Sequence, residues 1–549
     1  MGSGGISSLL NISKSSLFAQ TQAIRVIGDN IANANVEGYS RRRANIETLT
    51  TSADANSISL GSGVNVRTIS RLVDKFLSSQ IHSATSDRAK SEIRDELLSR
   101  AEGPFSLEDT VGQIGFQLSE FFSSLDDLSA DPANMSLRQN VIEQGASLSQ
   151  AIQSSYESIA SLQREADNRI GLVIGEVNSM TADIAELNTQ ISTLEISEQE
   201  ALALRDKRDQ LLKELSEKLS INSVENGDGT VLVSLSNGFT LVNGSSARAL
   251  DFTASPSFAP VSGYPPGLDN SALRHIVYDY DSSSTTEHID LTSVIGTAGG
   301  ELGGLLSLRG IQSDTDTSAF DASGDLVLIG ARIEAVARDL LVRFNQTYLG
   351  PVDEDPVTAG FQASSVDLNG NNPSPFGLFT VAGASDDDAD GLPSIADLQA
   401  STSFVGYASA ISFNISDPAN IAAAIDLDTA TSGSTPFGDA DNTNIRNLVA
   451  QRNVETNYSV GAFSATATLE DLYNTTVTYV GSQASSAATN LAINTTREEQ
   501  VLALQQNTSG VSLDEEFAQL IKFQRAYEGS ARMIQVGDNL LQELVRLLG

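Results

Sequence analysis

The stretch from Ser512 to Gly549 constrains the fold most, because it has the pattern of one long amphipathic helix. It contains no proline, and its apolar residues recur at every seventh position, which is the spacing of a coiled-coil seam. The seam residues that we assign are Leu513, Phe517, Leu520, Tyr527, Ile534, Leu541 and Leu548. A helix with such a stripe needs another helix to cover it, since the stripe would otherwise leave apolar surface in water.

Both ends of this helix carry recognisable signals. Ser512 and Glu515 have the spacing of a capping box, in which each side chain bonds the other residue's backbone N–H. Acidic residues in the first turn and Arg546 near the end match the helix dipole, which is positive at its N-terminus and negative at its C-terminus. The sequence therefore predicts a helix that begins close to Ser512.

Residues 1–40 supply a candidate partner for this helix. Their apolar residues are again seven apart, at Leu10, Leu17, Ile24 and Ile31. We expect the helix to end near residues 33–35, with Gly38 in the left-handed conformation beyond it. The two terminal helices could pair within one monomer only, or could pair and also pack against neighbouring subunits, and coiled-coil spacing does not distinguish these alternatives.

The composition excludes several classes of function. The 549-residue chain is 40% hydrophobic, which indicates a globular protein with more than one domain, and its net charge of −37 argues against nucleic acid and anionic membranes as partners. No apolar run is long enough for a membrane span, and no apolar segment after Met1 indicates a signal peptide. The absence of cysteine excludes disulfides and thiol chemistry, and it suits a chain that crosses between redox compartments unfolded.

In the middle of the chain, the spacing of the apolar residues changes from helical to strand-like and back again. Helical spacing extends from about residue 74 to 219, with its best heptads at residues 170–194, and at Ser220 the period becomes that of strands joined by Asn-Gly turns. Helices are expected again at 331–348, near 443–456 and from about 465 to 506. The predicted fold is mainly α with an inserted β domain (α+β), comprising terminal coiled-coil helices, a long helical bundle and a small antiparallel β domain.

Three domains follow from these changes of period. Residues 1–40 and 512–549 would form the terminal coiled-coil domain, residues 41–220 and 305–511 a helical bundle, and residues 221–304 the inserted antiparallel β domain.

No pattern in the chain predicts catalysis. The histidines, His82, His275 and His288, lie in no metal-binding or catalytic motif, and no glycine directly precedes a lysine, which excludes a P-loop. Residues 386–397 begin like a calcium loop, but Pro393 and the short Asp397 depart from that pattern, so we interpret them as an acidic loop. We therefore predict no catalytic, cofactor-binding or metal-binding residues, and no enzyme.

Two terminal motifs carry a resemblance to a known family. The segment from Asp29 to Arg41 is similar to the N-terminal signature of the flagellar rod, hook and hook-associated proteins. Its motif residues are Asn30, Asn33, Asn35, Gly38 and Tyr39. The segment from Gly510 to Tyr527 resembles the C-terminus of the hook-associated branch of that family, and shorter matches in between extend the resemblance over nearly the full chain.

This resemblance implies a structural role without enzymatic activity. A member of this family would form the junction ring between the hook and the filament of the bacterial flagellum, assembling with copies of itself through its terminal helices. The implied partners are the hook protein, a second hook–filament junction protein, an export chaperone and the type III export apparatus. The implied location is extracellular, after export without a cleaved signal peptide. A hook or rod subunit, or an axial scaffold with an adhesive outer domain, remain the alternatives.

Overall fold

A computed structural model of the chain describes the backbone of fifteen ranges. They are residues 2–36, 38–49, 62–105, 113–196, 200–253, 273–279, 288–311, 323–350, 365–369, 371, 373, 377–381, 407–425, 440–460 and 463–548. These residues fall into two compact units. Unit 1 comprises residues 1–88, 175–249 and 493–549, and unit 2 comprises residues 89–174 and 250–492. Helices α2 (Lys75–Glu102), α4 (Met135–Glu195) and α13 (Leu469–Ser509) contribute residues to both.

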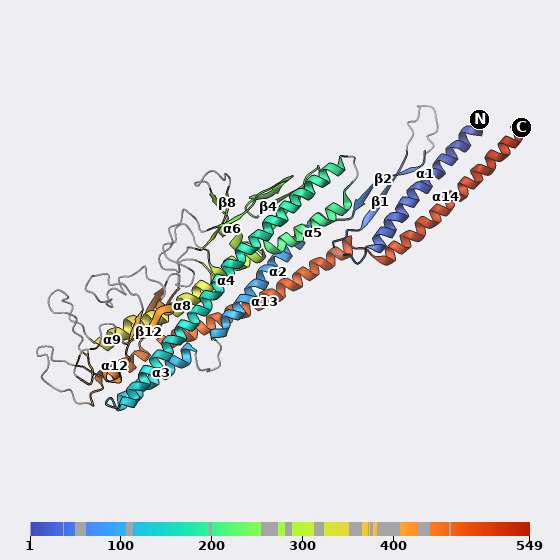
Figure 1. Cartoon of the computed structure of the whole chain (residues 1–549). Coiled ribbons are helices and arrows are strands. Elements are labelled where there is room, and N and C mark those ends of the chain that lie inside the picture. The colour runs from blue at the N-terminus through green and yellow to red at the C-terminus, as the bar shows by residue number, and fades with distance from the viewer. Residues whose placement is uncertain are drawn as a thin grey trace. The chain divides into compact units, whose positions relative to one another are not determined.

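Unit 1 contains both terminal helices, α1 (Gly2–Ala32) and α14 (Leu513–Leu548). They lie side by side and antiparallel, so that the N- and C-termini are at the same end of the pair (Figure 1). A hairpin of β1 (Arg42–Thr48) and β2 (Val64–Arg71) packs on α1, where the Val64 N–H donates to Ser15 Oγ at 3.2 Å. The predicted terminal helices are thus both present, and α1 ends within about one turn of the predicted boundary.

The rest of unit 1 joins helices to a small antiparallel sheet. Its helix α5 (Leu202–Lys218) leads directly into that sheet, which has the order β3-β4-β5-β6. The strands are β3 (Ile221–Glu225), β4 (Val231–Leu235), β5 (Thr240–Asn243) and β6 (Ser246–Ala247). The three Asn-Gly turns expected from the sequence connect these strands in succession, so the change of period at Ser220 is confirmed.

Buried polar side chains attach this sheet to the helices. Asn188 of α4 is fully buried and donates to the carbonyl oxygens of Val231 and Gly244, both at 2.9 Å. Its own oxygen accepts from the Val231 N–H and from Arg208 of α5, both at 3.0 Å. Because every hydrogen-bonding position of the Asn188 amide is used, burying it costs little free energy. Its hydrogen bonds orient the sheet on α4 and α5.

Unit 2 is built from helices and short antiparallel strand pairs. Its helices are α3 (Ile114–Ala130), α6 (Thr292–Thr297), α7 (Gly300–Arg309), α8 (Asp325–Asp339), α9 (Asn345–Leu349), α11 (Tyr407–Ala410) and α12 (Thr443–Ala450), with a π-helical turn at Leu340–Phe344. Its strands are β7 (Asp251–Thr253), β8 (His275–Asp279), β9 (His288–Asp290), β10 (Ser365–Val366), β11 (Phe379–Val381), β12 (Ile411–Phe413), β13 (Ala424–Ile425), β14 (Thr456–Val460) and β15 (Phe463–Ala467). They form the sheets β7-β8-β9, β10-β13, β11-β12 and β14-β15.

The core of unit 2 contains a cluster of phenylalanines. Phe121 of α3 lies with its ring centroid 5.6 Å from Phe379 and 6.3 Å from Phe344 and Phe413. Phe379 and Phe413, on paired strands, meet edge to face at 5.4 Å. Edge-to-face rings place positive ring edges against negative ring faces, so this cluster fixes α3 against the β11–β12 pair through geometry as well as burial.

The predicted fold class, mainly α with antiparallel β structure, is confirmed. Two predicted helix boundaries were wrong, because residues 456–460 and 463–467 form the β14–β15 hairpin. The strands between residues 221 and 304 belong to two separate sheets, and residues from Thr292 onward are helical. The three-domain division stays a prediction, and the acidic segment 386–397 lies outside the described residues.

We predict that Phe121→Ala lowers the free energy of unfolding of unit 2 by about 3–5 kcal/mol, because it removes a ring that is fully buried among other rings. Leu172→Ala is the control, since that side chain is 72% exposed and its loss should change little. Denaturant unfolding of the full chain, followed by hydrogen exchange of amides in α3 and α8, measures the difference. Equal effects of the two substitutions would contradict the prediction.

Candidate functional site

The terminal helix pair is held in register by contacts along its length. Asn30 meets Glu516 at one end, Ser16 Oγ lies 2.8 Å from Ser530 Oγ in the middle, and Leu10 lies against Gly537 towards the other end. Residue numbers that rise on α1 therefore fall on α14, as the antiparallel arrangement requires (Figure 1). A Cβ at Gly537 would lie 2.7 Å from Leu10 Cδ2, so glycine at this position allows the two helices to approach closely.

The seam residues assigned from the sequence differ in exposure. Seven are partly buried, namely Leu10, Leu17, Ile24, Ile31, Leu520, Ile534 and Leu541. Leu513, Phe517 and Tyr527 are 44%, 48% and 42% exposed, and the side chain of Leu548 lies outside the described part. The heptad assignment thus identified one of the two rows of α14 residues that face α1. It also included Phe517, which lies four residues after Leu513 and belongs to neither row.

The second half of that face was missed by sequence reasoning. Glu516, Ser530 and Gly537 each contact α1, and they lie three residues after Leu513, Tyr527 and Ile534. Together they form the companion row of a heptad, but because they are polar or small they do not read as a hydrophobic seam. The sequence signals for them were a spacing in multiples of seven and the partly buried Phe523 and Leu544 at the same heptad position.

A cluster of polar residues, which we call the polar junction, lies where the terminal helices meet the rest of unit 1. Its members are Asn30, Tyr39, Arg41, Arg42, Glu515 and Glu516. Glu516 and Asn30 are both 1% exposed, although one is an acid and the other an amide. Buried polar groups of this kind persist in proteins only when they are paired.

Every hydrogen-bonding position of the Asn30 side chain is occupied. Its Nδ2 donates to the Arg42 carbonyl oxygen at 2.9 Å and to Glu516 Oε2 at 3.1 Å. Its Oδ1 accepts from the Arg42 N–H at 3.0 Å and from the Tyr39 hydroxyl at 2.8 Å. Only an amide can donate twice and accept twice in this way, so aspartate at this position would lose both donors.

Arg41 connects the N-terminal motif to the first turn of α14. Its Nε donates to Glu516 Oε1 and its Nη1 to Glu515 Oε2, both at 2.7 Å. The Arg41–Glu516 pair is nearly enclosed, with side-chain exposures of 13% and 2%, whereas Glu515 is 62% exposed. Burial raises the pKa of the Tyr39 hydroxyl, which keeps Tyr39 a neutral donor to Asn30.

The polar junction continues into α5. Arg42 Nη2 lies 3.3 Å from Asp206, and Arg71 of β2 lies 2.9 Å from Asp206 and 2.8 Å from Asp209. Gly38 has a φ of 78°, as expected from the sequence, and approaches Gln210 of α5. Of the remaining motif residues, Asn33 bonds the Asp29 carbonyl oxygen at 2.8 Å and Asn35 is exposed in the turn. The motif therefore acts as a shaped turn that joins α1, α14 and α5.

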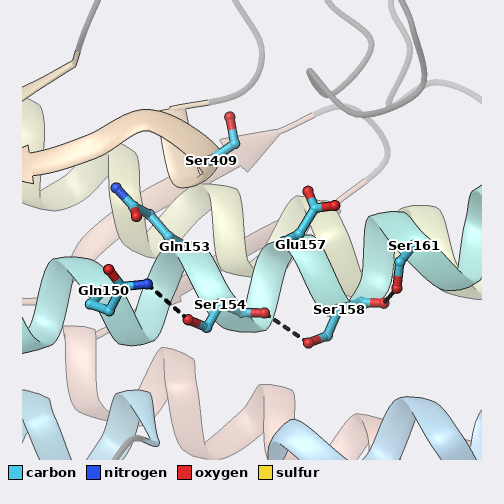
Figure 2. Close-up of a pocket in the computed structure, with 7 residues that line it drawn as sticks. All are labelled: Gln150, Gln153, Ser154, Glu157, Ser158, Ser161 and Ser409. Carbon is cyan, nitrogen blue, oxygen red and sulfur yellow. Dashed lines mark hydrogen bonds between the residues drawn. The ribbon is translucent and has the colours of Figure 1, made fainter.

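A polar groove lies on α4 in unit 2. It measures about 440 Å³ and is lined by Gln150, Gln153, Ser154, Glu157, Ser158, Ser161 and Ser409 (Figure 2). Three of its lining contacts stay within α4: Gln150 donates to Ser154, and the hydroxyls of Ser158 and Ser161 donate to backbone carbonyls one turn back. The Glu157 carboxylate pairs with Arg164, and the Ser158 and Ser161 hydroxyls donate to helix carbonyls, so these hydrogen bonds are not those of a nucleophile activated by a base.

The described residues contain no group of three or more acidic or histidine side chains arranged to hold a metal ion. None of the described helices is long and apolar enough to cross a membrane.

The terminal helix pair and its motifs define a class, the axial subunits of bacterial flagella. Models of rod proteins match both ends, as the "Flagella basal body rod protein" family at residues 10–39 and the "Flagellar basal body rod FlgEFG protein C-terminal" family at residues 505–547. The "Flagellar hook-associated protein FlgK helical domain" model matches residues 98–353. The chain belongs to the flagellar hook-associated protein family.

Full-length relatives support this placement. The chain is 26% identical to flagellar hook-associated protein 1 of Salmonella typhimurium and 27% identical to that of Escherichia coli K12, over 99% of this chain and 100% of each relative. It is 24% identical to flagellar hook-associated protein 1 of Bacillus subtilis, over 98% of both chains. The structure of the flagellar hook junction protein FlgK from Burkholderia pseudomallei has the same fold, with a TM-score of 0.58 at 16% identity, covering 79% of this chain and all of that one.

We predict that Asn30→Asp loosens the terminal helix pair, because aspartate lacks the donors to Arg42 and Glu516 and places a second carboxylate beside a buried one. Hydrogen exchange of the amides of α1 should accelerate by about tenfold or more. Asn11→Asp, an exposed position on the same helix, should leave exchange unchanged. Similar exchange in Asn30→Asp and the parent chain would contradict the assigned hydrogen bonds.

A second prediction concerns His82 of α2, which is 8% exposed and whose pKa burial lowers to about 4. The unfolded chain takes up a proton near pH 6.5 while the folded chain does not, so stability falls as the pH drops from about 6.5 to about 4. His82→Leu should remove this loss, which amounts to at most about 3 kcal/mol. Urea unfolding at pH 7.5, 6 and 5 measures it, and parallel pH profiles of the two chains would refute it.

Proposed function

We propose that the chain is a non-enzymatic structural subunit of the joint between the flagellar hook and filament, and that it assembles with copies of itself through its terminal helices. One observation identifies the surface through which copies would associate. After α1 and α14 have paired, α14 still exposes large apolar side chains along its length. They are Leu513, Phe517, Ile521, Tyr527, Met533, Val536, Leu540 and Val545, each between 42% and 67% exposed.

The apolar side chains on this surface would be stabilised by burial against another molecule. Full burial of one such side chain contributes roughly 1.5–3 kcal/mol, so covering several of them in every subunit would supply a large driving force for association. Several large apolar side chains exposed along one helix indicate a site of protein contact. A neighbouring subunit is the occupant that we propose, since each copy brings the same surface and flagellar axial proteins self-assemble.

The distribution of charge supports contact through the terminal helices. Residues 1–40 and 512–549 hold eight acidic and six basic side chains, a net charge of −2, whereas the whole chain has a net charge of −37. Unit 2 holds 44 acidic and 13 basic side chains, a net charge of −31. Like charges repel over roughly 8 Å at physiological salt, so copies approach each other at lowest electrostatic cost through their terminal helices.

We further infer the partners and location that this role requires. The hook protein would lie on one side of the ring and a second junction protein on the other. Before that, an export chaperone and the type III export apparatus would handle the unfolded chain, which would leave the cell without a cleaved signal peptide. The absence of cysteine supports such a route, since an oxidising exterior then offers no incorrect disulfides.

A hook or rod subunit is the second candidate, because the family models that match the two ends of the chain are those of rod proteins. The hook-associated model over residues 98–353 and the full-length relatives favour the junction. Locating a labelled copy of the chain on isolated flagella distinguishes them. A band at the hook–filament boundary supports the junction role, and label along the hook or within the rod would overturn it.

We predict that Ile521→Asp abolishes incorporation into flagella while the terminal helix pair remains folded, because Ile521 is 51% exposed and lies outside the contacts with α1. Leu520→Asp, one residue earlier and partly buried, should disrupt the pair itself, because the charge enters the α1–α14 seam. Circular dichroism and hydrogen exchange of the monomer separate these two effects.

Gln524→Asp is the matched control, since it adds the same charge at an exposed polar position of the same helix. Secreted and incorporated protein are measured separately, so that a defect in export is not mistaken for a defect in assembly. Normal incorporation of Ile521→Asp would show that this surface is not the contact between copies.

A further inference from the structure

We propose that Glu516, held by Asn30 and Arg41, sets the register of the antiparallel α1–α14 pair, and that the hydrophobic seam does not. This proposal concerns the folded monomer and does not depend on the proposed assembly. It assigns a specificity-determining role to a buried carboxylate in a helix interface whose apolar residues repeat every seven positions.

The apolar part of the seam is degenerate. On α14, Leu520, Ile534 and Leu541 belong to a row that repeats every seven residues, and the apolar residues of α1 repeat with the same period. If α14 moved by one heptad along α1, about 10 Å, towards the start of α1, Leu520 would face Ala19 in place of Val26, and Ser530 would face Leu9 in place of Ser16. The hydrophobic effect is not directional, so the apolar rows discriminate between the two registers only through the difference in the area that they bury.

The polar contacts are not degenerate. Facing residues in the observed pair are Asn30 with Glu516 and Ser16 with Ser530, so their numbers sum to 546 in each case. A shift by one heptad in one direction would place Glu516 opposite Ala23, and in the other direction beyond the end of α1. In the first case a buried carboxylate would face a methyl group, without the Asn30 donor and without Arg41.

Two other contacts discriminate less strongly. Ser16 and Ser530 share a hydrogen bond between neutral hydroxyls, and Ser530 also donates to Gln20 Oε1 of α1 at 3.4 Å. Each serine has a further partner in its own helix. Gly537 faces the end of the Leu10 side chain, which can rotate away at modest cost. The charged, enclosed contact of Glu516 therefore dominates the choice of register, in the same way that a single buried polar residue specifies register in other coiled coils.

Cross-linking tests this proposal directly, because the chain contains no cysteine. Ser16→Cys with Ser530→Cys reports the observed register, since the two Oγ atoms are 2.8 Å apart. Leu9→Cys with Ser530→Cys reports the register shifted by one heptad. Each pair is placed in the full-length chain, at a dilution where only intramolecular disulfides form, and the yield of disulfide is measured under mild oxidation.

In the parent chain we expect the 16–530 disulfide to form at a yield at least about tenfold above that of the 9–530 disulfide. Glu516→Leu should bring the two yields close together, because it leaves an apolar side chain that either register accepts. Glu516→Gln should reduce the parent preference only in part, because its single amide oxygen can accept from Asn30 or from Arg41, while its NH2 group meets the other donor. Glu515→Leu, the neighbouring and 62% exposed partner of Arg41, should keep the parent preference.

Three results would overturn the proposal. The first is a parent chain without the 16–530 disulfide, and the second is a Glu516→Leu chain that retains the parent preference. The third is loss of the preference in Glu515→Leu as well, which would assign the register to the exposed ion pair. Circular dichroism of each variant shows whether helix content is retained, so that unfolding is distinguished from a change of register.

Discussion

The fully paired burial of Glu516 is the interaction on which the arrangement of unit 1 depends. An enclosed carboxylate costs several kcal/mol unless hydrogen-bond donors compensate for the water it has lost. Here Asn30, in the last turn of α1, and Arg41, in the segment that follows α1, supply those donors. Because these donors come from separate segments, Glu516 is satisfied only when α1, its following turn and α14 are all in place.

The same constraint explains why the N-terminal motif has its composition. Asn30 needs an amide, Tyr39 needs a hydroxyl that reaches it, and Gly38 needs a positive φ between them. Arg42 and Arg71 then bond Asp206 of α5, so the turn is anchored on both sides. A motif that looks like a family signature in the sequence is, in physical terms, a satisfied hydrogen-bond network around one tight turn.

Much of the helical structure could be predicted from the sequence, because hydrophobic period reports burial directly. Ile170, Val177 and Ile184 are fully buried as their heptad predicts, and the Asn-Gly turns set the hairpins of β3–β6. The face of α14 that lies on α1 could be predicted only in part. Its second row contains Glu516, Ser530 and Gly537, and a pattern of apolar residues cannot show that a carboxylate is buried, since its partners are distant in the sequence.

The two faces of α14 differ in the kind of side chain that they present. The face on α1 combines an apolar row with a charged, paired residue, and pairing of this kind contributes to specificity at some cost in stability. The rest of the α14 surface has the reverse character, since large apolar side chains such as Phe517, Ile521 and Leu540 are about half exposed on it. An outward apolar surface favours association without fixing its geometry. In the proposed assembly, an inner pair of defined register would give the outer surface a reproducible shape, which a subunit that meets identical neighbours requires.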